Sequence, residues 1–247
     1  MCQPIDVILV PKGEEFKAVQ RGVERALATF SDSQAIKIVA LPVGPGPVGR
    51  FMQTWMASMS VNCDDHRPTV ILMGLCGGLQ SSLPVGQAVL YEHCLDGTRS
   101  QISAEIPCST QLFSTLSNIL GDRVTIVTGV TCDRVISRAA QKQQLAQTHA
   151  ADVVDMEGVV ALTCLRDQGY EVGMVRVVSD NARGDVPDLN HAFDAQGNLR
   201  PSKLAGQFLK QPLGALRLIR GSLKALAVLE VMAFQLQSAN VRSSLGA

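Results

Sequence analysis

The sequence predicts one α/β domain in which helices cover both faces of a mixed, mostly parallel central sheet, a three-layer α/β/α sandwich. Short apolar runs alternate with segments of helical periodicity along the chain. The runs are continuously apolar, which is typical of strands covered on both faces. A chain of 247 residues, 46% hydrophobic and 18% charged, can bury one large core. Two smaller domains fit less well.

Each expected strand is an apolar run that ends in glycine or in a polar segment. Residues 7–10 precede PKGEE, residues 36–41 precede PVGPGPVG, and residues 70–73 precede GLCGGL. Helical patterns follow the first two of these segments. The first half is therefore expected to contain strand 7–10, helix 14–30, strand 36–41, helix 48–59, strand 70–73 and strand 88–91, and an antiparallel orientation is open for the last.

The second half ends in a strand, a helix and a strand. Residues 124–127 precede TGVTCD, and the stretch VVDMEGVVALTCLRDQGYEVGMVRVVSDNA holds two apolar runs around a helical pattern that stops at Gly169. Three such elements in about thirty residues predict a parallel βαβ unit. The expected elements are helix 111–120, strand 124–127, helix 138–148, strand 153–156, helix 157–167 and strand 172–179.

Two carboxylates follow the strands of this unit. Glu157 comes directly after residues 153–156, and Asp180 comes directly after residues 172–179. A parallel crossover places both strand ends at one edge of the sheet, where ligands bind in α/β proteins. We therefore expect both carboxylates to face one cleft.

Arg176 lies inside the last apolar strand, where a lone charge is unfavourable unless it is paired. If the strand is regular, alternation places Arg176 and Asp180 on the same face. One interpretation is a structural ion pair with Asp155 or Glu157. Two carboxylates and an arginine near one strand end favour the other interpretation, a catalytic site.

Several motifs narrow the function. Residues 44–49 match GxGxxG, but two prolines remove backbone donors and no acidic strand end follows at the required distance, so we exclude a dinucleotide site. The glycines of GLCGGL let the backbone approach another group closely, which is either a ligand or a helix packed on the strand. No GxSxG or GxxxxGK[ST] motif is present, which excludes serine hydrolases of that type and P-loop NTPases. The histidines are isolated, without metal-ligand spacing, and are expected in loops or on the surface: His66, His93, His149 and His191.

The last third of the chain changes character after Asp180. Residues 181–202 are polar and predict either a lid over the cleft or a surface excursion. Residues 203–238 predict C-terminal helices broken at Pro212, for core packing or a subunit interface. Because Lys224 and Glu230 interrupt the apolar pattern, no membrane span is expected. We treat residues 1–247 as a single domain.

Charge and cysteine content point to a cytoplasmic protein. Lys and Arg together number 22, as do Asp and Glu, so no nucleic-acid partner is expected. The N-terminal sequence MCQPIDVILVP has no basic region before its apolar run, so no signal peptide is expected. The seven cysteines show no CxxC pair and are expected to be reduced, buried thiols: Cys2, Cys63, Cys76, Cys94, Cys108, Cys132 and Cys164. No metal or cofactor is expected.

Read in order, these motifs resemble the superfamily of purine nucleoside phosphorylases and methylthioadenosine/S-adenosylhomocysteine nucleosidases. VILVPKGEEFKAV resembles its opening strand and glutamate-bearing loop, MGLCGGL its glycine-rich loop, TCDRVI its base pocket, VVDMEG its ribose loop and VRVVSDNA its acid-bearing strand end. The tail from Arg183 onward is most similar to the hopanoid-associated phosphorylase-like branch. The resemblance implies a nucleoside phosphorylase-like fold and cleavage of a purine N-glycosidic bond.

The resemblance also implies roles for individual residues. Asp180 matches the acid that protonates the departing purine at N7, which requires a desolvated site that keeps a proton on it. Glu15 matches the glutamate that activates the attacking water, with Arg176 in the same catalytic set. The implied substrate-binding residues are Glu157 for the ribose hydroxyls, Met156 against sugar and base, Val135 and Ile136 in the base pocket, and Cys76, Gly77 and Ser179 beside them.

Three departures from the family pattern bear on the nucleophile and the base. Leu72 replaces a phosphate-binding arginine, Leu75 replaces a serine, and Val135 replaces an aromatic residue that stacks on the base. Leucine cannot hold phosphate, so water is the favoured nucleophile for a 5′-substituted adenosine. The alternatives are phosphorolysis, with Lys12, Arg50 or Arg134 forming another anion site, and a non-catalytic nucleoside-binding or structural relative. The resemblance implies a homo-oligomer, either a dimer or a hexamer.

Overall fold

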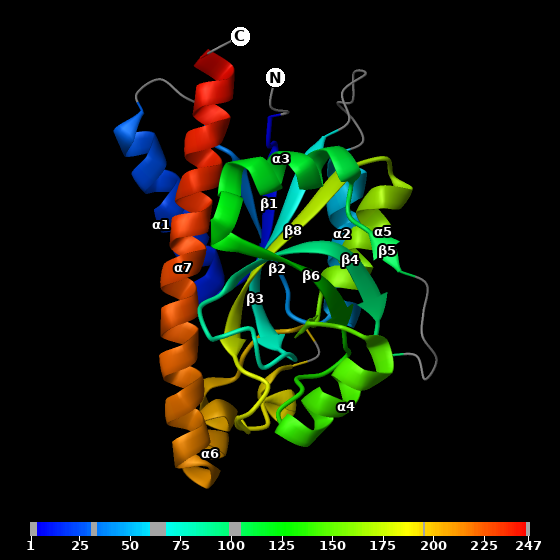
Figure 1. Ribbon diagram of the computed structural model, residues 1–247, viewed down its shortest axis with the longest axis vertical. Coiled ribbons are helices and arrows are strands. Elements are labelled where there is room, and N and C mark those ends of the chain that lie inside the picture. Colours follow the sequence, from blue (N-terminus) through cyan, green and yellow to red (C-terminus); the bar gives the residue numbers. More distant parts are fainter. Residues whose placement is uncertain (1–3, 31–33, 60–67, 99–104, 195, 246–247) are drawn as a thin grey trace.

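The computed structural model describes residues 4–30, 34–59, 68–98, 105–194 and 196–245. Cys2, Cys63 and His66 lie outside these ranges. Within them, the chain forms an eight-stranded mixed sheet with helices packed around it (Figure 1). The predicted α/β class is therefore confirmed.

Except for one short strand, each strand and helix overlaps a predicted element. The strands are β1 (Val7–Pro11), β2 (Lys37–Leu41), β3 (Thr69–Gly78), β4 (Ala88–Asp96), β5 (Ile106–Pro107), β6 (Val124–Thr131), β7 (Val153–Asp155) and β8 (Glu171–Asp180). The helices are α1 (Glu14–Thr29), α2 (Pro45–Met59), α3 (Thr110–Leu120), α4 (Ala139–His149), α5 (Gly158–Asp167), α6 (Pro201–Lys210) and α7 (Pro212–Leu245), with short 3₁₀ turns at Gly121–Arg123 and Asn190–Ala192. The strand without a predicted counterpart is β5, and β3, β4 and β6 extend four to five residues beyond their predicted ends.

The sheet is mostly parallel, as predicted, but part of it closes on itself. Parallel pairs join β1 to β2 and β3, β3 to β8, β6 to β4, and β6 to β7. Antiparallel pairs join β4 to β5 and β8, and β3 to β7. The path β3–β8–β4–β6–β7 thus returns to β3. The apolar runs did not reveal this closure, because it depends on pairing between strands distant in sequence.

The predicted parallel βαβ unit is wrong. β7 pairs antiparallel with β3, whereas β8 pairs parallel with β3, so the two strands joined by α5 run in opposite directions. They are not neighbours in a parallel sheet, and the crossover rule therefore does not apply to them. Both nevertheless end beside Gly77, which pairs with Val154 on one side and with Asp180 on the other.

Two expected glycine loops belong to regular elements. All of GLCGGL except Leu79 belongs to the second half of β3, and its glycines let neighbouring side chains approach the strand backbone closely. The GPGPVG segment is largely the first turn of α2, where the absent N–H of proline removes no helical hydrogen bond. Only Gly44, at φ +91°, precedes the helix in a left-handed conformation.

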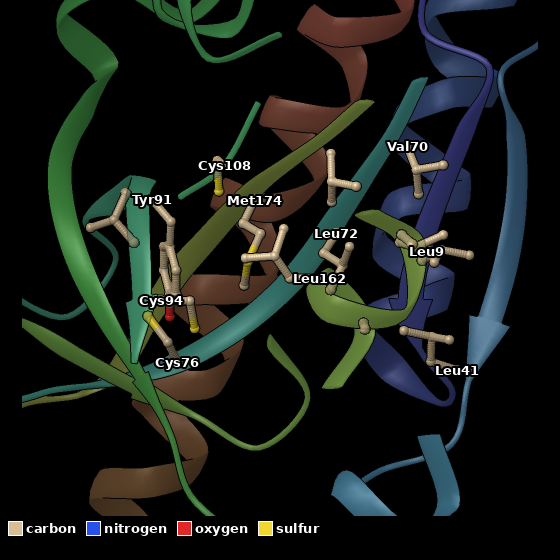
Figure 2. Close-up of a cluster of buried hydrophobic side chains, with 14 of the residues drawn as sticks. Leu9, Leu41, Val70, Leu72, Cys76, Tyr91, Cys94, Cys108, Leu162 and Met174 are labelled. Carbon is tan, nitrogen blue, oxygen red and sulfur yellow. The ribbon is translucent and has the colours of Figure 1, made fainter. Parts of the chain in front are cut away.

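Two apolar layers separate the helices from the sheet. On one face, α2 and α5 pack through Met52 and Leu162 against β1, β3 and β8, in the cluster that Figure 2 shows. On the other face, α1, α3 and α7 contribute Val19, Leu116 and Leu229 to a second cluster. A smaller cluster lies under α4. The three-layer α/β/α arrangement is therefore confirmed.

The C-terminal helices are longer than predicted, since α6 begins at Pro201 and α7 runs to Leu245. α7 lies along α1 (Figure 1), and Gly22 permits this close packing because a Cβ there would lie 2.3 Å from the Glu230 carbonyl oxygen. None of the helices in the described ranges has the length and apolar character needed to cross a membrane.

Candidate active site

Four ionisable side chains meet beside Gly74 of β3. Arg176 comes from β8, Asp155 from the end of β7, Glu157 from the second residue after β7, and Glu15 from the first turn of α1. A Cβ at position 74 would lie 2.5 Å from Arg176 Nη1 and 2.9 Å from Glu15 Oε1. The glycine therefore makes room for two charged groups against the strand.

Arg176 is the centre of this cluster. Its side chain is 1% exposed, and Nη2 lies 3.6 Å from both Asp155 Oδ2 and Glu157 Oε2. Both partners of the predicted ion pair are thus present. Nε and Nη1 have no hydrogen-bond partner among the described residues. The guanidinium therefore pairs with both carboxylates through Nη2, and its Nε and Nη1 remain available as hydrogen-bond donors inside the site.

Asp155 is fixed by hydrogen bonds from its surroundings. The Thr131 hydroxyl donates to Asp155 Oδ1 at 2.6 Å, and the Gly158 backbone N–H donates to the same oxygen at 3.0 Å. Asp155 thereby holds Arg176 in place and caps the start of α5. The sequence predicted Asp155 only as an ion-pair partner.

Glu157 is buried and faces the loop before α2. Its Oε1 accepts a hydrogen bond from the Gly44 backbone N–H at 3.1 Å. Burial raises the pKa of Glu157, while Arg176 opposes this rise. A Cβ at Gly44 would lie 3.7 Å from the Met156 side chain, so Met156 lies at the same loop. Both residues of the predicted ribose loop therefore come together here.

Glu15 reaches the cluster from α1. Its Oε1 accepts a hydrogen bond from the Leu75 backbone N–H at 2.7 Å. Burial, and to a smaller extent the nearby Glu157 charge, raises the pKa of Glu15 to about 7. A carboxyl group with this pKa suits a general base near neutral pH.

Asp180 forms its ion pair with Lys142 of α4, whereas the guanidinium pairs with Asp155 and Glu157. The pairing of β3 with β8 shifts between Cys76 and Gly77 and leaves Ser179 without a partner. Alternation is therefore interrupted, and Asp180 is out of phase with Arg176. The prediction that Arg176 and Asp180 share a face assumed a regular strand, and the register shift removes that condition.

Lys142 is the functional candidate that sequence reasoning missed. Its side chain is fully buried, and Nζ contacts Asp180 Oδ2 and donates to the Asn181 carbonyl oxygen at 2.8 Å. Ser179 Oγ donates to Asp180 Oδ1 at 2.8 Å. The signal was weak, because a lysine in the polar sequence AAQKQQLAQTH resembles any exposed helical residue.

The remaining predicted residues lie around these two groups. Cys76 packs its thiol into the core, where burial raises its pKa, and its carbonyl accepts from the Ser179 hydroxyl at 3.2 Å. Gly77 makes room for Asp180, since a Cβ there would lie 3.4 Å from Asp180 Oδ2. Ile136 joins the small apolar cluster under α4. Val135 is partly exposed, and its backbone exchanges hydrogen bonds with Asn190.

The substituted positions offer no anion site. Leu72 is 1% exposed in the core beside α2 and α5, and Leu75 packs against the opposite apolar layer. Lys12 Nζ contacts Asn198 Oδ1. His149 is buried at the end of α4, so the expectation that it is a loop or surface histidine is wrong.

The polar segment 181–202 packs onto the loops beside the site. A Cβ at Gly197 would lie 2.2 Å from the Val43 carbonyl oxygen, and the Val186 backbone N–H donates to the Ser137 carbonyl oxygen at 2.9 Å. The segment therefore joins the loop before α2 to the turn before α4. A surface hollow of about 700 Å³ lies at its start, between α4 and Ala182.

A sequence comparison matches this chain to a known family. The profile of the phosphorylase superfamily matches residues 17–210, which include Glu157, Arg176 and Asp180. Glu15 lies two residues before the matched segment. No curated protein matches the sequence significantly.

Solved structures share the fold. A 5′-methylthioadenosine/S-adenosylhomocysteine nucleosidase of Neisseria meningitidis, with methylthio-immucillin-A, has a TM-score of 0.67 and 14% identity over 96% of this chain and 100% of that one. The Helicobacter pylori nucleosidase with butyl-thio-DADMe-Immucillin-A has a TM-score of 0.62 and 13% identity, and the match covers 100% of this chain and 99% of that one. Futalosine hydrolase of Helicobacter pylori has a TM-score of 0.62 and 13% identity, and the match covers 93% of this chain and 97% of that one. These identities establish the fold alone, and the expected nucleoside phosphorylase-like fold is confirmed.

Proposed function

Because the chain belongs to the phosphorylase superfamily, we propose that it cleaves the N-glycosidic bond of a purine nucleoside, a 5′-substituted adenosine, with water as the nucleophile. The observation that carries this proposal is the meeting of Glu15, Glu157 and Arg176 beside Gly74, with the pKa of Glu15 raised to about 7. The nucleosidases and the futalosine hydrolase that share the fold support it by analogy.

In this mechanism, Glu15 takes a proton from water as the water attacks the anomeric carbon. Glu157 accepts hydrogen bonds from the ribose hydroxyls, and Arg176 holds Glu157 for that role at 3.6 Å. The bond to the purine breaks as the sugar gains oxocarbenium character. Three carboxyl groups around one guanidinium favour this developing positive charge.

The departing purine needs a proton at N7, and we assign its delivery to Asp180 and Lys142 together. The sequence predicted a desolvated aspartic acid, whereas Asp180 contacts a buried ammonium. The proton passes from Lys142 Nζ to the Asp180 carboxylate and from Asp180 to N7, which leaves a neutral amine that water reprotonates. The contact with Asn181 fixes the ammonium at the end of β8.

Phosphorolysis is the less favoured alternative. Leu72 and Leu75 provide no donor, and Glu15, Asp155 and Glu157 repel a phosphate dianion from the free donors of Arg176. The resemblance to the hopanoid-associated branch is a further prediction, which implies a long apolar 5′ arm on the substrate. Activity on adenosines with 5′-alkylthio arms of increasing length tests it.

The deciding experiment measures release of free base from adenosine, methylthioadenosine, S-adenosylhomocysteine and inosine, each with and without phosphate. We expect release without phosphate and free ribose derivatives as products. Release that requires phosphate, with a sugar 1-phosphate as product, would establish phosphorolysis instead. If purine nucleosides bind in a titration but are never cleaved, the chain is a binding protein.

A further inference from the structure

The α6–α7 face, which we define as the exposed side chains of residues 199–224, has an unusual composition. It carries six exposed basic residues, and no Asp or Glu occurs between Asp194 and Glu230. The whole chain is neutral, so the rest of it carries a net charge of −6. The basic residues are Arg200, Lys203, Lys210, Arg217, Arg220 and Lys224.

The same face carries most of the exposed large apolar side chains of the described residues. Leu209 and Leu213 are 84% and 79% exposed, and Leu223 is 63% exposed. Leu199, Leu216 and Ile219 are 41–45% exposed. Elsewhere in the described ranges, only Ile126 and Val231 belong to this class.

Along the first half of α7, Leu216, Ile219 and Leu223 form an apolar row at helical spacing, and a basic residue follows each of them in sequence. Arg217 and Lys224 flank the row on the side of the body, since Arg217 Nη1 donates to the Asp185 carbonyl oxygen at 2.9 Å and the Lys224 side chain packs at Gly86. The opposite side of the helix packs on the body of the protein, since a Cβ at Gly221 would lie 2.1 Å from the Ser179 carbonyl oxygen. The apolar row therefore points away from the core.

We propose that the α6–α7 face docks on an anionic lipid surface. A helix that displays an apolar row beside a basic row lies in the plane of a membrane interface, with its leucines among the acyl chains and its cations at the headgroups. Figure 1 shows α6 beside the lower end of α7. This docking does not depend on what the site cleaves.

Charge favours a lipid surface over a second copy of the chain. Two copies joined through this face would bring their basic rows together without an acidic residue between 196 and 229 to compensate. A bilayer with anionic headgroups complements both rows at once.

The test is co-sedimentation with vesicles of phosphatidylcholine alone and with vesicles in which about a third of the lipid is phosphatidylglycerol. We expect binding to the anionic vesicles that weakens as salt rises. R220E is expected to reduce it by about tenfold, and the double variant Leu213→Gln with Leu223→Gln is expected to reduce it similarly. Arg123→Glu and Ile126→Thr are the matched controls, because both residues are exposed outside the face.

Three results would overturn the proposal. The first is the absence of binding, or equal binding to both kinds of vesicle. The second is loss of binding in R220E but not in the leucine variant, which would indicate a soluble polyanion. The third is a dimer in sedimentation velocity that the leucine variant dissociates, which would assign the face to a second copy. Circular dichroism confirms that each variant is folded.

Discussion

At the scale of single residues, Glu15 is the most sharply defined chemical group of the candidate site. Its carboxyl group lies near Arg176 at Gly74 and accepts a hydrogen bond from the Leu75 N–H. Replacing Glu15 by Gln keeps an acceptor for that N–H and removes the base. We expect base release to fall about 10²- to 10⁴-fold with the fold intact, as steady-state kinetics would measure.

Glu14→Gln is the matched control, because its side chain is 68% exposed one residue earlier. Base release should also rise with pH through about 7 in the unchanged protein, since Glu15 acts only when deprotonated. Full activity in Glu15→Gln, or a rate that does not change between pH 5 and 8, would remove Glu15 from the mechanism.

Lys142 gives a second prediction at this scale. Lys142→Met preserves most of the buried side-chain volume and removes the ammonium beside Asp180. We expect kcat for adenosine substrates to fall, because the purine then leaves without a resupplied proton. A riboside of 4-nitrophenol, whose leaving group needs no proton, should retain its rate.

Lys203→Met, at an exposed site on α6, is the control for this exchange. Equal losses on adenosine and on the nitrophenyl riboside would show that Lys142 serves only to hold the structure. Asp180→Asn should follow the same pattern as Lys142→Met if the two side chains act together.

At the scale of elements, α7 and the end of β8 are coupled through one glycine. A Cβ at Gly221 would lie 2.1 Å from the Ser179 carbonyl oxygen, a contact between backbones that no rotamer change relieves. Gly221→Ala is therefore expected to lower the free energy of unfolding by about 1–3 kcal/mol. Urea unfolding followed by circular dichroism measures this.

Gly206→Ala in α6 is the matched control. No heavy atom lies within 4 Å of a Cβ at that position. The exchange should therefore stabilise the protein by about 0.4–1 kcal/mol, because alanine lowers the conformational entropy of the unfolded chain. Equal stability changes in both variants would mean that α7 does not press on β8 as the structure indicates.

At the scale of the whole molecule, the buried carboxyl groups tie stability to pH. In the folded protein the pKa of Glu15 is raised to about 7, whereas an ordinary glutamate carboxyl group has a pKa of 4.5. Between these values the folded state binds more protons, so the free energy of unfolding should fall as pH rises through this window. Glu157, whose pKa burial also raises, acts in the same direction.

Urea midpoints at pH 5 and pH 8 check this expectation. The decrease should be smaller in Glu15→Gln. In Glu14→Gln the decrease should be at least as large as in the unchanged protein. The hydrogen bond with Lys17 lowers the pKa of Glu14, so Glu14 adds stability as pH rises, and the variant loses that contribution. A larger midpoint at pH 8 than at pH 5 in the unchanged protein would contradict the assignment of Glu15 as a buried acid.

The sequence by itself determined the class of the fold and the strand ends that carry chemistry. Continuous apolar runs located the strands, because a strand buried on both faces has apolar residues at successive positions of the sequence. Glu157 and Asp180 were placed beside strand ends because each directly follows its run. These features depend on neighbouring residues alone, and the roles of Glu15, Glu157 and Asp180 stay predictions.

Only the tertiary structure decided how these groups meet. The opposite direction of β7 and β8, the register shift at Ser179 and the closure of the sheet arise from pairing between strands distant in sequence. Lys142 reaches Asp180 because the fold buries one side of α4, and the leucines of α7 are exposed because nothing in the described chain covers them. Such contacts join residues far apart in sequence, so no local pattern encodes them.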